Sequence, residues 1–143
     1  MEQRLSLVTL GVRDLDAARA FYALLGWREA PTSNAGIAFF DLGGFALALF
    51  DHHALAADVG VGAAGEGFRA LTLAQNVASA AVVDATLAEA DAAGGRLVKP
   101  GGPTAWGGYA GYVADPDGHL WEIAHNPLAP LDEAGRLKLE GGT

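Results

Sequence analysis

The stretch "GYVADPDGHLWEIA", residues 111–124, predicts a β-hairpin and is the part of the sequence that decides the fold. Its centre, "DPDG", is a turn signal, and the segments on both sides are rich in apolar residues. The second segment carries a carboxylate, Glu122, among apolar neighbours. Burying such a charge costs free energy unless it is paired. Glu122 therefore faces a metal, a ligand or water, and is the first candidate functional residue.

The same pattern occurs earlier in the chain. "DLGG" before "FALALF" parallels "DPDG" before "HLWEIA", with an offset of 74 residues (118 − 44). The strand-like segments "LSLVTLGV" (5–12) and "FRALTLAQNV" (68–77) align Thr9 with Thr72, with an offset of 63 (72 − 9). The second copy thus carries about eleven extra residues (74 − 63), which we assign to the loop "KPGGPTAWGG".

An amphipathic helix is predicted after the first strand of each copy. In the first copy Asp14 is the expected N-cap, and Gly26 stands where a C-terminal glycine belongs. In the second copy the helix lies within "VVDATLAEADAAGG", residues 82–95. The order is βαβββ in both copies, which predicts an α+β fold. We expect one domain, 1–143, divided into module one (5–51), a linker (52–67), module two (68–127) and a surface tail (128–143).

Composition narrows the possible partners. The 17 acidic and nine basic residues give a formal net charge of −8, which argues against nucleic acid or an anionic membrane as a partner. There are no cysteines, so disulfides and thiolate metal sites are excluded. No apolar run approaches the ~20 residues of a membrane span, and the first residues lack a signal-peptide pattern. A cytoplasmic location is expected.

Two motifs, "LVTLGVRDLDAARAFYALLGW" and "WGGYAGYVADPDGHLWEIAHNP", resemble the vicinal oxygen chelate superfamily. Its members include glyoxalase I, ring-cleaving dioxygenases, fosfomycin-resistance enzymes and bleomycin-binding proteins. The resemblance covers residues 5–127 and implies two βαβββ modules that form a curled mixed sheet around a groove. It also implies a homodimer. Because this scaffold carries many activities, function has to be argued from the site.

The resemblance further implies where a metal would bind, on the first and last strands of each module. These positions correspond to Leu7, Ala48, Ala70 and Glu122, of which three are aliphatic. One carboxylate is too few ligands for a divalent metal, so we expect no metal and no other cofactor. The side chains of Gln75 and of the four histidines, His52, His53, His119 and His125, are expected to lie elsewhere.

If Glu122 faces the groove, the alternation of a strand predicts the other residues of that face. The candidate ligand-binding residues are Leu7, Thr9, Ala48, Phe50, Ala70, Thr72, Trp106, Tyr112 and Glu122. Trp106 either contacts the ligand or covers a sheet or a subunit interface. For Tyr109 we favour such a structural role.

Two functions suit a groove whose wall is mostly apolar and carries a single carboxylate, that of Glu122. The first is metal-independent binding of an aromatic or natural-product-like small molecule. The alternative is a lyase or isomerase with Glu122 as general acid/base. A metal-dependent glyoxalase or dioxygenase is a third possibility, against which the aliphatic residues weigh.

Overall fold

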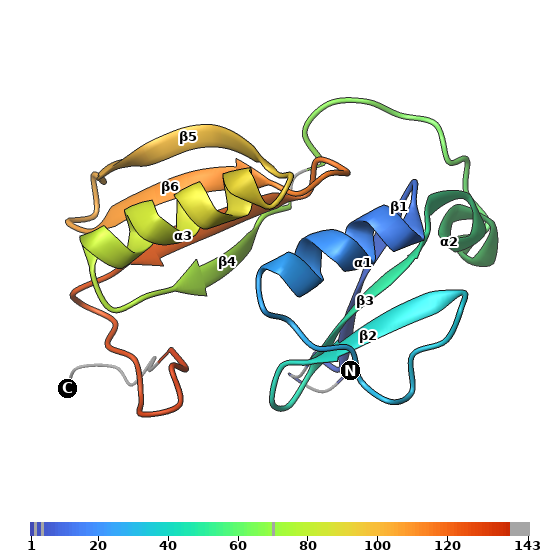
Figure 1. Ribbon diagram of the computed structural model, residues 1–143, viewed down its shortest axis with the longest axis horizontal. Coiled ribbons are helices and arrows are strands. Elements are labelled where there is room, and N and C mark those ends of the chain that lie inside the picture. Colours follow the sequence, from blue (N-terminus) through green and yellow to red (C-terminus); the bar gives the residue numbers. More distant parts are fainter. Residues whose placement is uncertain (2, 4, 70, 138–143) are drawn as a thin grey trace. The chain divides into compact units, whose positions relative to one another are not determined.

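The computed structural model describes residues 1, 3, 5–69 and 71–137. The chain divides into two compact units, Met1–Arg69 and Ala70–Thr143, each built around its own sheet (Figure 1). Ala70, one of the predicted ligand-binding residues, lies outside the described residues. In the described part of the chain, no helix has the length and apolar character needed to cross a membrane.

The first unit is a small mixed sheet with two helices. Strand β1 (Leu7–Val12) is followed by helix α1 (Leu15–Leu24) and the strands β2 (Ile37–Asp41) and β3 (Ala46–Asp51). The strand order is β1-β3-β2, with β1 parallel and β2 antiparallel to β3. Helix α2 (His52–Val59) follows directly.

The predicted signals around α1 are confirmed. Asp14 is its N-cap, with a carboxylate oxygen that accepts a hydrogen bond from Ala17 N–H at 2.9 Å. Gly26 has a φ of 83°, the left-handed conformation that ends helices. One side of α1 buries Phe21 and Tyr22, and α1 contacts β2 and β3. The core of this unit consists of such side chains together with the buried residues Leu10, Val12, Phe40, Leu47 and Leu49.

In its described residues, the first copy has one strand fewer than the predicted βαβββ order. The expected strand between α1 and β2 is reduced to a backbone hydrogen bond from Ala30 N–H to Phe39 C=O, at 2.7 Å. Pro31 follows directly and has no N–H with which to extend a ladder. The Arg19 guanidinium instead holds this segment, donating to the carbonyl oxygens of Asn34 and Ile37.

Helix α2 was not predicted, because residues 52–67 were interpreted as a linker. Asp51 caps it by accepting a hydrogen bond from Ala54 N–H at 2.8 Å, and Gly60 ends it with a φ of 82°. His52 Nε2 lies 2.7 Å from the Ala63 carbonyl oxygen, so this half-buried ring ties the helix to the segment that follows. None of the helix's residues is fully buried, which leaves no clear amphipathic pattern in the sequence.

The second unit has the complete predicted order. It comprises β4 (Leu73–Asn76), α3 (Ala80–Ala92), β5 (Arg96–Pro103), β6 (Tyr109–Ala114) and β7 (Leu120–His125). The strand order is β4-β7-β6-β5, with β4 parallel to β7 and the other pairs antiparallel. The two-module α+β fold is thereby confirmed. The prediction that residues 99–108 form a loop is partly wrong, because β5 continues to Pro103, with irregularities in its register against β6.

Hydrogen bonds to Asp115, its own first residue, stabilise the "DPDG" turn. Asp115 is 3% exposed, and its Oδ1 accepts hydrogen bonds from the N–H groups of Asp117 and His119, at 3.0 and 2.9 Å. Its other oxygen lies 2.8 Å from His119 Nδ1. Gly118 has a φ of 88°, which favours glycine. The motif therefore sets the turn that aligns β6 with β7.

Candidate active or ligand-binding face

The second sheet has one face against α3 and one face away from it. A Cβ atom on Gly111 of β6 would lie 2.5 Å from Leu87 Cδ1 of α3, so that side of Gly111 faces the helix. The next residue, Tyr112, therefore projects from the opposite face. Its direct neighbours across the ladders are Glu122 on β7 and Lys99 on β5, and Ala74 on β4 follows beyond Glu122. We call this surface the Glu122 face; it consists of Ala74, Asn76, Arg96, Lys99, Gly102, Ala110, Tyr112, Ala114, Leu120, Glu122 and Ala124.

Tyr112 supplies the partner that Glu122 needs. Burial raises the pKa of the Tyr112 phenol above its ordinary value of 10.0, and the charge of Glu122 and a hydrogen bond with it raise this pKa further. Both side chains are half-buried. A carboxylate can accept about four hydrogen bonds, so one phenol leaves it able to accept more. The carboxylate is thus held by the sheet and remains able to bind a donor group.

Small side chains surround the pair. Ala110, Ala114 and Ala124 are all buried on the same face, and Ala74 is exposed beside Glu122. Ala110, Ala114 and Ala124 are at most 4% exposed, so neighbouring atoms cover them. The face therefore combines small apolar side chains with the Glu122 carboxylate, the Tyr112 phenol and the cationic side chains of Arg96 and Lys99. Small-molecule sites likewise combine an apolar lining with a few polar groups.

In the first unit, four predicted residues share the corresponding face. Thr9 is opposite Ala48, and Leu7 and Phe50 have the same parity on β1 and β3. Ala48 is fully buried, whereas Leu7 is 40% exposed. The structure brings these four side chains to one face, as predicted.

The predicted alignment of the first strands is shifted by two residues. Ala48 is opposite Thr9, whereas its counterpart Glu122 is opposite Ala74, an offset of 65 (74 − 9) instead of 63. The shift keeps the parity, so the predicted faces are unchanged. Thr72 becomes the counterpart of Leu7; it is exposed and precedes β4.

The two aromatic residues near the β5–β6 turn have local contacts. A Cβ atom on Gly108 would lie 1.8 Å from Trp106 Cζ3, so the indole ring packs across this glycine of its own turn. Trp106 is 44% exposed, and it precedes β6, whereas Tyr112 lies within that strand. The Tyr109 hydroxyl donates to both oxygens of Asp84 on α3, at 3.0 and 3.1 Å, in agreement with a structural role.

The donor set does not fit a metal ion. Leu7 and Ala48 offer no ligand atom, and in the described residues no three His, Cys, Asp or Glu side chains are grouped so as to hold one. Gln75 pairs with Ile123, which places it on the face opposite Glu122. His52 and His119 have the partners given above, His125 Nδ1 lies 3.2 Å from the Val77 carbonyl oxygen, and His53 is exposed.

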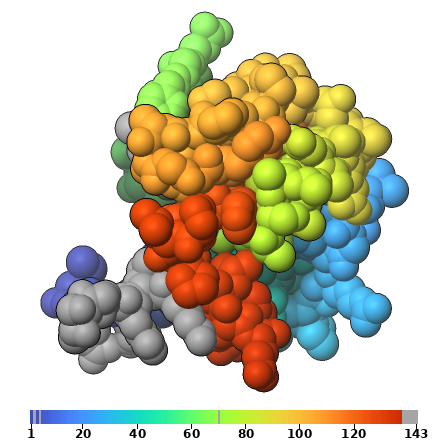
Figure 2. Space-filling view, turned by 90° about the vertical axis from the view of Figure 1, so that its left-hand side faces the viewer, coloured from blue at the N-terminus to red at the C-terminus, as the bar shows by residue number. Residues whose placement is uncertain are grey.

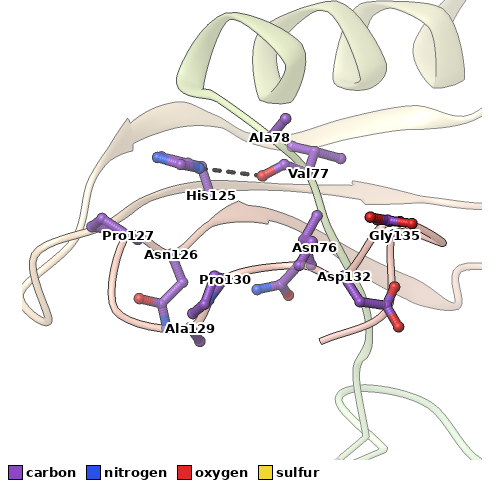
Figure 3. A pocket seen from close by; sticks show the side chains of 12 residues that line it. Asn76, Val77, Ala78, His125, Asn126, Pro127, Ala129, Pro130, Asp132 and Gly135 are labelled. Atoms are coloured by element: carbon purple, nitrogen blue, oxygen red, sulfur yellow. Dashed lines mark hydrogen bonds between the residues drawn. The ribbon is translucent and has the colours of Figure 1, made fainter. Parts of the chain in front are cut away.

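A cavity of about 530 Å³ lies at the end of β4 and β7 (Figure 3). One wall is the segment before α3, and the other is the chain after β7. Figure 2 shows these segments side by side at the surface, in yellow-green and red. The lining residues are Asn76, Val77, Ala78, His125, Asn126, Pro127, Ala129, Pro130, Leu131, Asp132, Glu133 and Gly135. Sequence reasoning missed this cavity because it treated residues 128–143 as a surface tail.

Comparisons with known proteins place these observations in a family. The model of the Glyoxalase/Bleomycin resistance protein/Dioxygenase superfamily matches residues 4–123. A glyoxalase-related enzyme from Fulvimarina pelagi is 38% identical, with a TM-score of 0.89 over 98% of this chain and 100% of that chain. No functionally curated protein matches.

Two further solved structures are similar over most of their length. A glyoxalase/bleomycin resistance protein/dioxygenase family enzyme from Burkholderia phytofirmans PsJN is 25% identical, with a TM-score of 0.72 over 84% of this chain and 96% of that chain. A glyoxalase/bleomycin resistance protein/dioxygenase from Nocardioides is 26% identical, with a TM-score of 0.70 over 87% and 84%.

Proposed function

Because the chain belongs to the Glyoxalase/Bleomycin resistance protein/Dioxygenase superfamily, we propose that it binds a small organic molecule on the Glu122 face without a metal ion. The observation that carries this proposal is the Tyr112–Glu122 pair, which has Lys99 on one side and small apolar residues on the other. Glu122 accepts a hydrogen bond from a ligand donor, while Tyr112 holds the carboxylate in place.

An aromatic or natural-product-like ligand suits this surface best. The half-buried Tyr112 ring offers an aromatic edge or face for contact, and the exposed Ala74 lies beyond Glu122. Thr72 and Trp106 are further candidate contacts. On the first unit, Leu7, Thr9, Ala48 and Phe50 form a second candidate surface of similar character.

A lyase or isomerase reaction is the second candidate function. Here Glu122 accepts a proton from the substrate as general base and returns it as general acid. The phenol of Tyr112, whose pKa is raised, stays protonated at neutral pH and keeps its hydrogen bond to the carboxylate. The Fulvimarina pelagi relative is described as an enzyme, which supports a catalytic role.

Native mass spectrometry of the protein purified from cell extract tests the binding function. We expect a bound small molecule that is lost or reduced in Glu122→Gln, a variant that keeps the shape and removes the charge. Calorimetric titration with the recovered compound should then give an affinity weaker by about 1–3 kcal/mol, the range for a hydrogen bond to a charged group. The control is Glu89→Gln, which removes a charge from the exposed side of α3.

Two outcomes separate the alternatives. If the recovered compound is converted by the native protein but not by Glu122→Gln, the function is catalytic; if it is returned unchanged, the protein is a binder. Equal affinity in the native protein, Glu122→Gln and Tyr112→Phe would show that the site is elsewhere.

A further inference from the structure

The cavity at the end of β4 and β7 has a structured outer wall. Asn126 Oδ1 accepts a hydrogen bond from Leu128 N–H at 2.9 Å. Asp132 Oδ1 accepts hydrogen bonds from the N–H groups of Ala134 and Arg136, at 2.9 and 2.8 Å, which closes a second turn. A β-bridge also joins Leu131 to Leu137. These contacts hold the segment in a defined course beside a half-open pocket of about 530 Å³, a volume within the range of small-molecule sites.

Asn76 connects this pocket with the Glu122 face. On β4 it lies two residues beyond Ala74, and it pairs with Ala124, two residues beyond Glu122. Asn76 and Glu122 are therefore diagonal neighbours on one sheet face, a relationship that spans about 7–8 Å. Figure 3 shows the Asn76 side chain directed toward the segment after β7. Within the described part of the chain, this half-buried amide makes no side-chain hydrogen bond and can bind a ligand.

The charges of the lining favour a cation. Asp132 and Glu133 are acidic, and none of the lining residues is lysine or arginine. His125 is anchored through Nδ1, which donates to the Val77 carbonyl oxygen because a carbonyl can only accept. Prolines, alanines, Val77 and Leu131 supply the apolar part of the lining. An anionic group would meet repulsion here, whereas an ammonium group would be attracted by two carboxylates.

We propose that this pocket binds the ammonium end of an organic cation whose aromatic end reaches the Tyr112–Glu122 pair. The inference deepens the proposed function and rests on it for the aromatic end only. Asn76 contacts the ligand between the two ends, and Asp132 and Glu133 select its charge. The ligand class is thus an amine joined to an aromatic group by a short chain.

Three fluorescent probes with the same aromatic group test the charge preference. Dansylcadaverine carries an ammonium group, dansylamide is neutral, and dansylglycine carries a carboxylate. In fluorescence titrations at about 0.15 M salt, which limits long-range attraction, we expect the ammonium probe to bind about tenfold more tightly than the other two. Equal affinity for the three probes, or no saturation by dansylcadaverine up to about 1 mM, would overturn the proposal.

Matched variants locate the binding. Glu133→Gln should weaken dansylcadaverine binding about threefold to fivefold, as for a partly exposed ion pair, and Asn76→Ala about fivefold to tenfold. Glu89→Gln changes the net charge equally and should have no effect. An equal loss in Glu89→Gln and Glu133→Gln would mean that the probe senses only the overall charge, which contradicts a pocket.

Glu122→Gln separates this inference from the proposed function. If Glu133→Gln and Asn76→Ala weaken binding while Glu122→Gln does not, the pocket stands and the proposed role of Glu122 fails. If only Glu122→Gln weakens binding, the proposed function stands and the pocket is not part of the site.

Discussion

Tyr112 and Glu122 are direct partners across the β6–β7 ladder, and the negative charge of Glu122 and a hydrogen bond to it help to raise the pKa of the Tyr112 phenol, after burial. This relationship explains how a carboxylate is accommodated in the apolar segment "HLWEIA". The donor comes from the neighbouring strand of the same hairpin, so the pairing is formed by the turn motif itself. Both side chains lie on the face away from α3, so the half-buried pair is not part of the core between α3 and the sheet.

The ionisation of Tyr112 should therefore depend on Glu122. Its pKa is raised above 10.0 by burial, by the negative charge of Glu122 and by their hydrogen bond. Glu122→Gln removes the charge and should lower the Tyr112 pKa toward the ordinary value. The measurement is a pH titration of ¹³Cζ-labelled tyrosine by NMR, which resolves each phenol. An unchanged Tyr112 titration in Glu122→Gln would show that the pair is not formed in solution.

Tyr109 provides a matched control for that titration. Its pKa is raised by the hydrogen bond to Asp84. Asp84→Asn should lower the Tyr109 pKa and leave the Tyr112 pKa unaffected. Glu122→Gln should lower the Tyr112 pKa and leave the Tyr109 pKa unaffected. Each effect would then be assigned to its own carboxylate.

The raised pKa of Tyr112 also predicts how stability depends on alkaline pH. In the unfolded chain the phenol loses its proton near pH 10.0, whereas in the folded protein it does so at higher pH. Above pH 10 the unfolded state thus binds fewer protons, and the free energy of unfolding falls as pH rises. Urea unfolding from pH 9 upward should show a smaller decrease for Tyr112→Phe than for the native protein. Identical slopes would contradict the prediction.

Gly111 should be intolerant of a side chain. A Cβ atom there would lie 2.5 Å from Leu87 Cδ1, and 2.8 and 2.9 Å from the backbone atoms Lys99 O and Gly101 N. Gly111→Ala should therefore lower the free energy of unfolding by about 1–3 kcal/mol, the usual cost of overpacking. Gly102→Ala is the control, because nothing lies within 4 Å of its Cβ position. Equal stability of the two variants would mean that α3 does not pack on β6 as described.

Features that depend on contacts between residues close together in the sequence could be predicted from it. Asp14, Gly26 and the "DPDG" turn act on nearby backbone, and the elements they delimit were predicted. The faces of β3 and β7 were predicted from the alternation of side chains along a strand. The alignment of β4 with β1 is shifted by two residues, which leaves these faces unchanged. Pro31 explains why the expected strand before β2 does not form. This proline was a local signal in the sequence, but the prediction did not take it into account.

Other features depend on contacts between distant residues, and these could not be predicted. The pairing of Tyr112 with Glu122 required the exact hairpin register, and Arg19 reaches carbonyl groups 15 and 18 residues away. The pocket joins residues 76–78 to residues 125–135. Nothing in "NPLAPLDEAG" itself indicates that it lies against the end of β4.

The protein should form a homodimer. β5 is an outermost strand of its sheet, and its side chains Leu97 and Val98 are 42% and 43% exposed. Exposed apolar edge strands are a hazard that pairing removes, and twofold symmetry is the commonest way to pair. Light scattering at micromolar concentration should give twice the chain mass, and Val98→Lys should shift the population toward monomer. A monomer mass for the native protein would be decisive against this prediction.

The protein should hold no stoichiometric divalent metal. The strand positions where the family resemblance implies ligands are occupied by Leu7, Ala48 and Ala70, which have no donor atom in their side chains, and by Glu122, whose carboxylate also interacts with Tyr112. One carboxylate supplies too few bonds to hold a divalent ion against water. Elemental analysis after purification without chelator should therefore give well under one metal per chain. EDTA should leave the melting temperature unchanged, because ligand removal shifts stability only if the ligand was bound. One tightly held metal per chain, with a melting temperature that EDTA lowers and the metal restores, would show that side chains at other positions supply the ligands.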